Sequence, residues 1–155
     1  MIYTEMTMKA MRLCYAAHFK QDDQCSVPYA FHPFHVAEQM DDEISTTVAL
    51  LHDVLEDCPF YSSEDLRKHY PQEVVDAVIL LTRDRGMTYK EYIKDLSKNP
   101  ISRKVKIADI LHNIDPGRLF PGDERFRERY ADALAYLIEV DNAERNQNDQ
   151  DPTSG

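Results

Sequence analysis

The chain has 155 residues, of which 43% are hydrophobic and 30% charged, and its formal net charge is −10. This length allows one sizeable core and is too short for two ordinary domains. The acidic balance disfavours nucleic acid polymers and anionic membranes as partners, because both bind through clustered Lys and Arg, and no segment approaches the roughly 18 apolar residues of a membrane span.

Cysteine usage and the N-terminal residues indicate a cytoplasmic protein. The cysteines, Cys14, Cys25 and Cys58, are odd in number and match no zinc or redox spacing, so we expect reduced thiols. We expect Cys14 to pack within a helix and Cys58 to be partly accessible. The N-terminus has no basic segment followed by an apolar run, and we therefore expect no export signal.

The spacing of apolar residues predicts an all-helical fold with short polar or proline-containing connections. Gly is scarce, at four residues, and no segment alternates as a strand would. The predicted helices cover, in chain order, residues 7–19, 32–40, 43–57, 62–70, 71–81, 89–96, 101–114 and 126–138. Residues 1–141 are expected to form one domain. The polar segment 142–155 is predicted to be a disordered tail, because it cannot bury a face.

The third predicted helix contains the most informative stretch, residues 50–57. It places His52, Asp53, Glu56 and Asp57 among leucine and valine residues that are expected to be buried. In one continuous helix His52 would lie under Glu56 and Asp53 under Asp57, which gathers the polar side chains in one patch. Unpaired carboxylates near an apolar core are costly, and a metal ion would balance them. The alternative is a solvated last helical turn, with His52 hydrogen-bonded in the core.

Two further residues favour a metal site over that alternative. His32 lies at the start of the second helix, and Asp109 is the lone carboxylate within an apolar helical segment. With His52 and Asp53 they give two nitrogen and two oxygen ligands, a set that suits manganese, iron or zinc better than calcium or magnesium. None is a thiolate, which argues against a closed structural zinc site. A catalytic site, with open positions for water or substrate, is the remaining reading.

Other side chains near these ligands suggest a reaction on an anionic substrate. Glu56 and Asp57 lie one turn from the histidine and aspartate ligands, where a base would be needed. Lys106 lies on nearly the same helix face as the aspartate ligand of its own helix, and Lys20 is close to the site in sequence. Tyr29 comes three residues before the first histidine ligand and is expected to line the pocket.

The order of these residues resembles that of the HD-domain metal-dependent phosphohydrolases. More narrowly, it is similar to the hydrolase domain of the Rel/Spo family and its short stand-alone relatives, which remove the 3′-pyrophosphate from the alarmone (p)ppGpp. The resemblance spans roughly residues 7–138. The segments that carry it are Ala17-His18, Gln21, Pro28-Tyr29, His32-Pro33, Val36-Ala37, Ala49-Leu50-Leu51-His52-Asp53-Val54, Glu56-Asp57, Val105-Lys106-Ile107-Ala108-Asp109 and His112-Asn113.

The resemblance implies an HD-domain helical bundle that binds one divalent metal ion, with Mn²⁺ first and Fe or Zn as alternatives. The metal ligands would be His32, His52, Asp53 and Asp109. The acidic pair that orients or deprotonates the attacking water would be Glu56 and Asp57. Lys106 and Asn113 match positions near the nucleotide and would bind the substrate. Lys20 and Tyr29 complete our candidate substrate-binding residues because of their places in the sequence. His18 matches a motif histidine that either supports the metal ligands or is structural, and we favour the structural role. The pattern gives no ligand role to His35, His69 and His112.

One departure from the family bears on the substrate. Alarmone hydrolases usually carry an Arg, often followed by Lys, in a loop near the guanine, and the matching positions here are Asp23 and Gln24. An acid there removes a stacking cation and adds repulsion toward a polyphosphate. We predict a phosphohydrolase of a phosphorylated nucleotide, with (p)ppGpp first. The alternatives are a nucleotide phosphatase of other specificity and a non-catalytic nucleotide-binding HD module. The sequence leaves the oligomeric state open.

Overall fold

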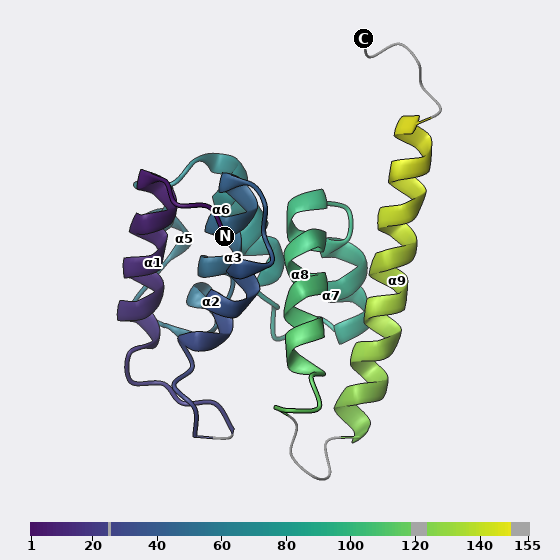
Figure 1. The fold of residues 1–155 in the computed structure, drawn as a ribbon, viewed down its shortest axis with the longest axis horizontal. Coiled ribbons are helices and arrows are strands. Elements are labelled where there is room, and N and C mark those ends of the chain that lie inside the picture. Colours follow the sequence, from purple (N-terminus) through teal and green to yellow (C-terminus); the bar gives the residue numbers. More distant parts are fainter. Residues whose placement is uncertain (25, 119–123, 150–155) are drawn as a thin grey trace.

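The computed structural model describes residues 1–24, 26–118 and 124–149, and within these ranges it contains helices and no strand. Figure 1 shows the helices in chain order. They are α1 (Glu5–His18), α2 (Phe31–Glu38), α3 (Glu43–Leu51), α4 (Val54–Asp57), α5 (Ser63–Arg67), α6 (Gln72–Leu81), α7 (Tyr89–Leu96), α8 (Pro100–Asn113) and α9 (Glu124–Asp149). The prediction of an all-helical single domain is confirmed. Among these helices, none has both the length and the apolar character needed to cross a membrane.

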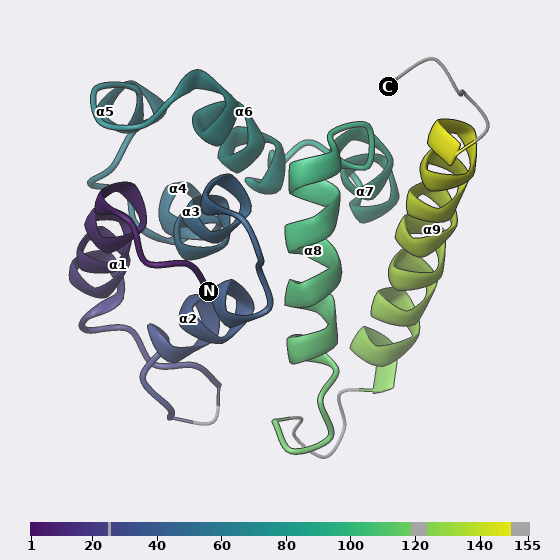
Figure 2. The same ribbon diagram turned by 45° about the horizontal axis from the view of Figure 1, so that its top comes forward.

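Helix α8 stands between two groups of helices. In Figures 1 and 2, α1 to α6 lie on one side of it, and α7 and α9 lie on the other. The buried apolar side chains form two clusters, one for each group of helices. The larger cluster includes Val105 of α8, and the smaller one includes Ile110 of the same helix. Helix α3 lies within the larger group, and every residue from Ser45 to Leu51 is buried. Side chains that leave α3 and α8 therefore start from rigid, packed backbone.

Polar caps fix where the central helices begin. Asp42 precedes α3, and its carboxylate accepts a hydrogen bond from the backbone N–H of Ser45 at 2.7 Å. Asn99 precedes α8, where its side chain accepts hydrogen bonds from two backbone N–H groups of the first turn. The next residue, Pro100, suits this position because the first helical turn needs no amide donor there. The two helices thus start at residues that the sequence marks clearly.

The prediction of one continuous helix over residues 43–57 is wrong. Helix α3 ends at Leu51, and α4 begins at Val54. Asp53 lies between them with φ −101° and ψ −2°, in a sparsely populated region of backbone conformation in which many active-site residues are found. The chain thus turns at the His52-Asp53 pair, and both side chains leave the backbone from this turn.

The prediction that residue 142 begins a disordered tail is wrong for residues 142–149, which continue α9. Arg103 of α8 explains the difference. Its guanidinium is buried, and it donates hydrogen bonds to the backbone carbonyl of Ser97 at 2.6 Å, to Asp141 at 3.2 Å and to Glu144. The polar end of α9 therefore packs through carboxylates that accept hydrogen bonds from a buried cation. A search of the sequence for an apolar helix face does not detect such an interaction. Residues 150–155 of the predicted tail lie outside the described residues.

Replacing Arg103 with methionine is expected to lower the free energy of unfolding by roughly 1 to 3 kcal/mol, because two carboxylates of α9 lose their buried partner. Amide hydrogen exchange over residues 142–149 should accelerate. Arg145→Met is the matched control, since Arg145 also pairs with Asp141, at 2.9 Å, but is largely exposed. Unchanged exchange in the Arg103→Met protein would contradict this account of α9.

The cysteine predictions are partly correct. Cys14 and Cys58 are free thiols and both are buried. The expectation that Cys58 is partly accessible is wrong, because its thiol packs under α1, 3.4 Å from the carbonyl oxygen of Ala17 and 3.7 Å from Nδ1 of His18. Cys25 lies outside the described residues.

Candidate metal centre

The fold brings together four side chains from three separate parts of the chain, which we call the His/Asp cluster: His32, His52, Asp53 and Asp109. His32 Nε2 lies 3.0 Å from Asp109 Oδ1 and 3.7 Å from Asp53 Oδ2. His52 Nε2 lies 3.0 Å from Asp53 Oδ2 and 3.9 Å from Asp109 Oδ1. Ligand atoms of His32, His52 and Asp109 all lie within 4.8 Å of one another, a spacing at which they could hold a metal ion.

His52, which directly follows α3, has a ring nitrogen whose nearest polar neighbours are carboxylate oxygens. His52 Nδ1 lies 2.7 Å from the carbonyl oxygen of Ala49, and since a carbonyl only accepts, this nitrogen carries a proton. His52 Nε2 points into the cluster, is buried, and makes no hydrogen bond with any of the described residues. A buried ring nitrogen that makes no hydrogen bond and faces two carboxylates is suited to a metal ligand.

The charges of the cluster call for a cation. Burial alone would lower the pKa of His52, but the Asp53 carboxylate raises it to about 9. Burial also opposes the ionised form of Asp109, yet the Lys106 ammonium and His32 hold the pKa of its carboxyl well below the usual range. The carboxylates are thus ionised at neutral pH and a proton on an imidazole balances them. A divalent ion fits these residues, because it can take the place of that proton.

The stability of the metal-free protein should depend on the protonation of His52. Its folded-state pKa is about 9, above the ordinary value near 6.5, so the stabilising contribution is complete below pH 6.5 and is lost as the pH rises through 9. We expect the free energy of unfolding in a chelator to fall by on the order of 2 to 3 kcal/mol across this window. Saturating Mn²⁺ should remove the fall.

Urea unfolding at several pH values, with and without Mn²⁺, measures this effect. His52→Asn supplies the comparison, because other groups also titrate between pH 6.5 and 9. An equally steep pH dependence in the metal-free His52→Asn protein would contradict the assignment of the effect to this imidazole.

Three of the four predicted substrate-binding residues lie against carboxylates of the cluster. The Tyr29 hydroxyl donates to Asp53 Oδ2 at 2.5 Å. Lys106 Nζ donates to Asp109 Oδ2 at 2.7 Å, and Asn113 Nδ2 donates to Asp109 Oδ1 at 2.6 Å. Burial and the neighbouring Asp53 raise the pKa of the Tyr29 phenol far above its usual value, so it remains a donor. These residues orient the carboxylates, and their contact with a substrate stays a prediction.

The fourth predicted substrate-binding residue, Lys20, is exposed in the turn that follows α1. It is absent from the described residues that line the cavity beside His32. The structure therefore does not bring Lys20 to the cluster, and its proposed contact with a substrate stays untested.

The predicted acidic pair lies on α4 with both side chains exposed. Glu56 Oε2 accepts a hydrogen bond from the backbone N–H of Arg83 at 3.1 Å, and Asp57 Oδ2 accepts one from Gln21 Nε2 at 3.1 Å. Partial desolvation of the Glu56 carboxyl raises its pKa, and the charge of Asp53 adds to this effect. Each carboxylate is thus held by one hydrogen bond, and the turn at His52 replaces the continuous helix from which their position was predicted.

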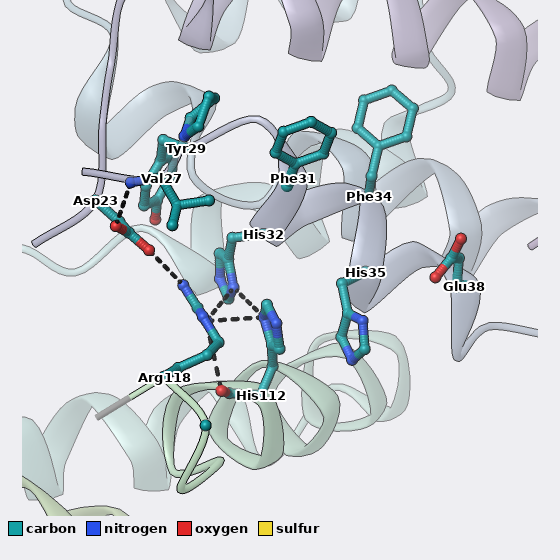
Figure 3. A pocket seen from close by; sticks show the side chains of 12 residues that line it. Asp23, Val27, Tyr29, Phe31, His32, Phe34, His35, Glu38, His112 and Arg118 are labelled. Carbon is teal, nitrogen blue, oxygen red and sulfur yellow. Dashed lines mark hydrogen bonds and ion pairs between the residues drawn. The ribbon is translucent and has the colours of Figure 1, made fainter. Parts of the chain in front are cut away.

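A cavity of about 410 Å³ lies beside His32, and Figure 3 shows the side chains around it. Tyr29 lines it together with His112 and Arg118. The His112 ring lies beside the His32 ring and nearly parallel to it, with a centroid distance of 5.0 Å, and it stacks on His35 at 4.0 Å. Burial and the Arg118 charge lower the pKa of His112 to about 3, so this ring is neutral.

Sequence reasoning assigned His112 no role at the site and gave Arg118 none either. His112 lies three residues after Asp109 on the same helix, so helical periodicity was a usable signal for it. Arg118 has no such signal, because it follows the end of α8 and meets Asp23 from a part of the chain 95 residues away.

Fold and site together define an all-helical protein with a buried cluster of histidine and aspartate side chains that could hold a metal ion. Comparison with known proteins agrees with this class. The chain is 29% identical over 136 residues to a probable GTP pyrophosphokinase of Mycobacterium leprae. It is 28% identical over 143 residues to the bifunctional (p)ppGpp synthase/hydrolase RelA of Mycobacterium tuberculosis. These alignments cover 79% and 82% of this chain.

The structural comparison extends over nearly the whole chain. A solved structure, described as a metazoan ortholog of SpoT that hydrolyses ppGpp, matches with a TM-score of 0.68 and 24% identity, over 95% of this chain and 98% of that chain. No protein-family model matches the sequence. The expected resemblance to Rel/Spo proteins is thus confirmed, in sequence by the mycobacterial relatives and in fold by the SpoT ortholog. The chain spans 17% and 19% of the length of those two relatives.

Proposed function

We propose that this protein is a cytoplasmic, metal-dependent phosphohydrolase that acts on a phosphorylated nucleotide, with (p)ppGpp as the first candidate substrate. The observation that carries the proposal is the buried His52 Nε2, which makes no hydrogen bond with the described residues and faces the Asp53 carboxylate at 3.0 Å within a cluster of two imidazoles and two carboxylates. The mixed nitrogen and oxygen donors favour Mn²⁺, with Fe or Zn as alternatives. The free, buried thiols Cys14 and Cys58 are typical of a reducing compartment.

The bound ion would supply Lewis acidity toward the phosphoryl oxygens and would lower the pKa of the attacking water. The chain supplies the orientation of the ligands. Lys106 and Asn113 hold the two oxygens of Asp109, while the Tyr29 hydroxyl holds Asp53. Contacts of this kind fix the direction of each carboxylate, on which metal affinity depends strongly.

Glu56 is our candidate for the group that orients the attacking water and accepts its proton. Its raised pKa brings the carboxylate closer to the basicity that such a step requires. The backbone N–H of Arg83 holds one carboxylate oxygen, which leaves the other for water. Asp57, held by Gln21, would support this group from the next position along α4.

The charge of Asp23 does not argue against an anionic nucleotide. Arg118 Nη2 donates to Asp23 Oδ2 at 3.2 Å, so the acid that replaces a cation of alarmone hydrolases is itself paired with a cation. The Asp23 side chain is 14% exposed and that of Arg118 is 25% exposed, which limits the screening of their attraction by water. The repulsion expected from the sequence is thereby offset, and the names of the relatives keep (p)ppGpp first among the candidates.

Product release from a nucleotide panel tests this proposal. The purified full chain with Mn²⁺ is incubated separately with ppGpp, with nucleoside monophosphates and with dinucleotides. The products are separated by anion exchange. Pyrophosphate and GDP from ppGpp are expected. Orthophosphate from other nucleotides with ppGpp intact would indicate a phosphatase of other specificity. Bound metal with no turnover of any compound would favour a non-catalytic nucleotide-binding module.

A further inference from the structure

Asp57 is tied to α1 and to the turn after it at two successive positions of the chain. Its Oδ2 accepts a hydrogen bond from Gln21 Nε2 at 3.1 Å. The thiol of the next residue, Cys58, is buried and donates to the carbonyl oxygen of Ala17 at 3.4 Å. The backbone N–H of Asp57 also donates to the carbonyl of Asp53, at 2.9 Å. The main chain on both sides of this carboxylate therefore has a fixed place, and Gln21 holds the carboxylate itself.

Gln21 is held in turn by its own main chain. Its backbone N–H donates to the carbonyl of His18 at 3.0 Å, and its carbonyl accepts a hydrogen bond from the backbone N–H of Tyr29 at 2.8 Å. Tyr29 is the residue whose hydroxyl donates to Asp53. The Gln21 side chain thus starts from a point fixed between the end of α1 and a residue that orients a carboxylate of the His/Asp cluster.

The Gln21 amide can face Asp57 in only one orientation. An ionised carboxylate has acceptors only, so the amide nitrogen must point toward Asp57 and the amide oxygen away from it. That oxygen, Oε1, lies 2.8 Å from His18 Nδ1. Because an amide oxygen only accepts, the His18 nitrogen is the donor and carries the proton. His18 Nε2 is buried and makes no hydrogen bond with any residue that the structure describes, as expected of a ring whose proton lies on Nδ1.

The imidazole that directs this amide belongs to the protein interior. His18 is 1% exposed, and its ring lies 5.1 Å from the ring of Tyr29, measured between centroids. Cys58 Sγ lies 3.7 Å from His18 Nδ1. An apolar side chain could fill much of this space, so the hydrogen bond to Gln21 is what an imidazole adds to the packing.

We propose that His18 and Gln21 are positioning residues, which hold the Asp57 carboxylate of the acidic pair in one orientation. The inference rests on the proposed phosphohydrolase function, in which Asp57 supports the group that orients the attacking water. His18 acts through the Gln21 amide, and Gln21 acts through Asp57. Since Asp57 is exposed on a helix of four residues, its carboxylate would otherwise sample several rotamers, and a support whose direction varies is less effective.

The orientation of Asp57 can be measured without metal or substrate. Three-bond NMR couplings of the Asp57 side chain in the isotope-labelled full chain report whether χ1 keeps one rotamer or averages over several. We expect one rotamer in the natural protein and averaging in Gln21→Met, whose side chain is similar in size but cannot donate. Averaging in the natural protein, or one unchanged rotamer in Gln21→Met, would overturn the proposal.

Turnover of ppGpp by the Mn²⁺-loaded full chain supplies the second measurement. Gln21→Met should lower kcat about 10-fold, while the Mn²⁺ dissociation constant stays that of the natural protein. His18→Leu should give a similar loss of kcat. His18→Asn keeps an N–H donor near the position of Nδ1 and should restore most of the rate, a rescue that a merely structural role of the ring would not give. Equal losses in His18→Asn and His18→Leu would overturn the role of His18.

The path through Asp57 is tested by combining substitutions. In an Asp57→Ala background, Gln21→Met should cause no further loss of kcat, because the amide acts only through that carboxylate. A further loss would overturn this path. Gln39→Met is the matched control, since the Gln39 amide also donates a hydrogen bond, to the carbonyl of His35 at 3.5 Å, but is exposed at the end of α2. Its kcat and its Asp57 couplings should equal those of the natural protein.

The positioning of Asp57 and the proposed function fail separately. A single Asp57 rotamer that Gln21→Met releases, in a chain that binds Mn²⁺ but hydrolyses no nucleotide, would reject the function alone. Undiminished turnover in Gln21→Met would reject the positioning role alone.

Discussion

Replacing Asp53 with alanine is expected to abolish metal retention and hydrolysis together. Its Oδ2 lies 3.0 Å from His52 Nε2 and 3.7 Å from His32 Nε2, so the carboxylate faces both ring nitrogens of the cluster. Without it, one carboxylate remains to balance a divalent ion, and the Tyr29 hydroxyl loses its acceptor. Metal analysis of the purified protein and product release from the nucleotide panel measure the two effects.

Asp76→Ala is the control for this substitution, because Asp76 is an aspartate of α6 whose carboxylate is about half exposed and pairs with Arg67. It should retain both metal and activity. A fully active Asp53→Ala protein would remove the basis for the whole site assignment.

Replacing Glu56 with glutamine is expected to lower kcat by about 10²- to 10⁴-fold while metal binding is retained. The amide keeps the size of the side chain and an oxygen for the backbone N–H of Arg83, but it cannot accept a proton. The comparison of kcat with the Mn²⁺ dissociation constant separates this residue from the ligands, whose loss lowers both. Glu64→Gln on the exposed surface of α5 is the control. An undiminished kcat in Glu56→Gln would show that another group accepts the proton of the attacking water, and Asp57 would be the first to examine.

Much of the fold could be predicted because the helices show their apolar faces and their ends in the sequence. Residues 89–96 were predicted as a helix and form α7, between the cap at Thr88 and the end of an amphipathic pattern. The turn at Asp53 could not be predicted in this way, since apolar residues continue on both sides of it and only tertiary packing selects the break. The last turns of α9 were missed because a buried arginine of another helix holds them.

The sequence predicts those residues of the candidate site that stand as isolated polar side chains within apolar segments. His52 and Asp109 stand out in this way, and the structure places them in one cluster. The pairing of Asp23 with Arg118 could not be predicted, since it joins two loops that have no periodic pattern. Sequence reasoning read Asp23 as an uncompensated negative charge, and the fold supplies the compensation.

The central claim is that a divalent ion held by the His/Asp cluster is required for hydrolysis of a phosphorylated nucleotide. The most direct test is titration of the metal-free full chain with Mn²⁺ in the presence of ppGpp, with pyrophosphate release followed by phosphorus NMR. We predict no release without metal and a rate that saturates at one Mn²⁺ per chain. Release that is independent of metal, or ppGpp left intact by a chain with one bound Mn²⁺, would contradict the claim for this substrate.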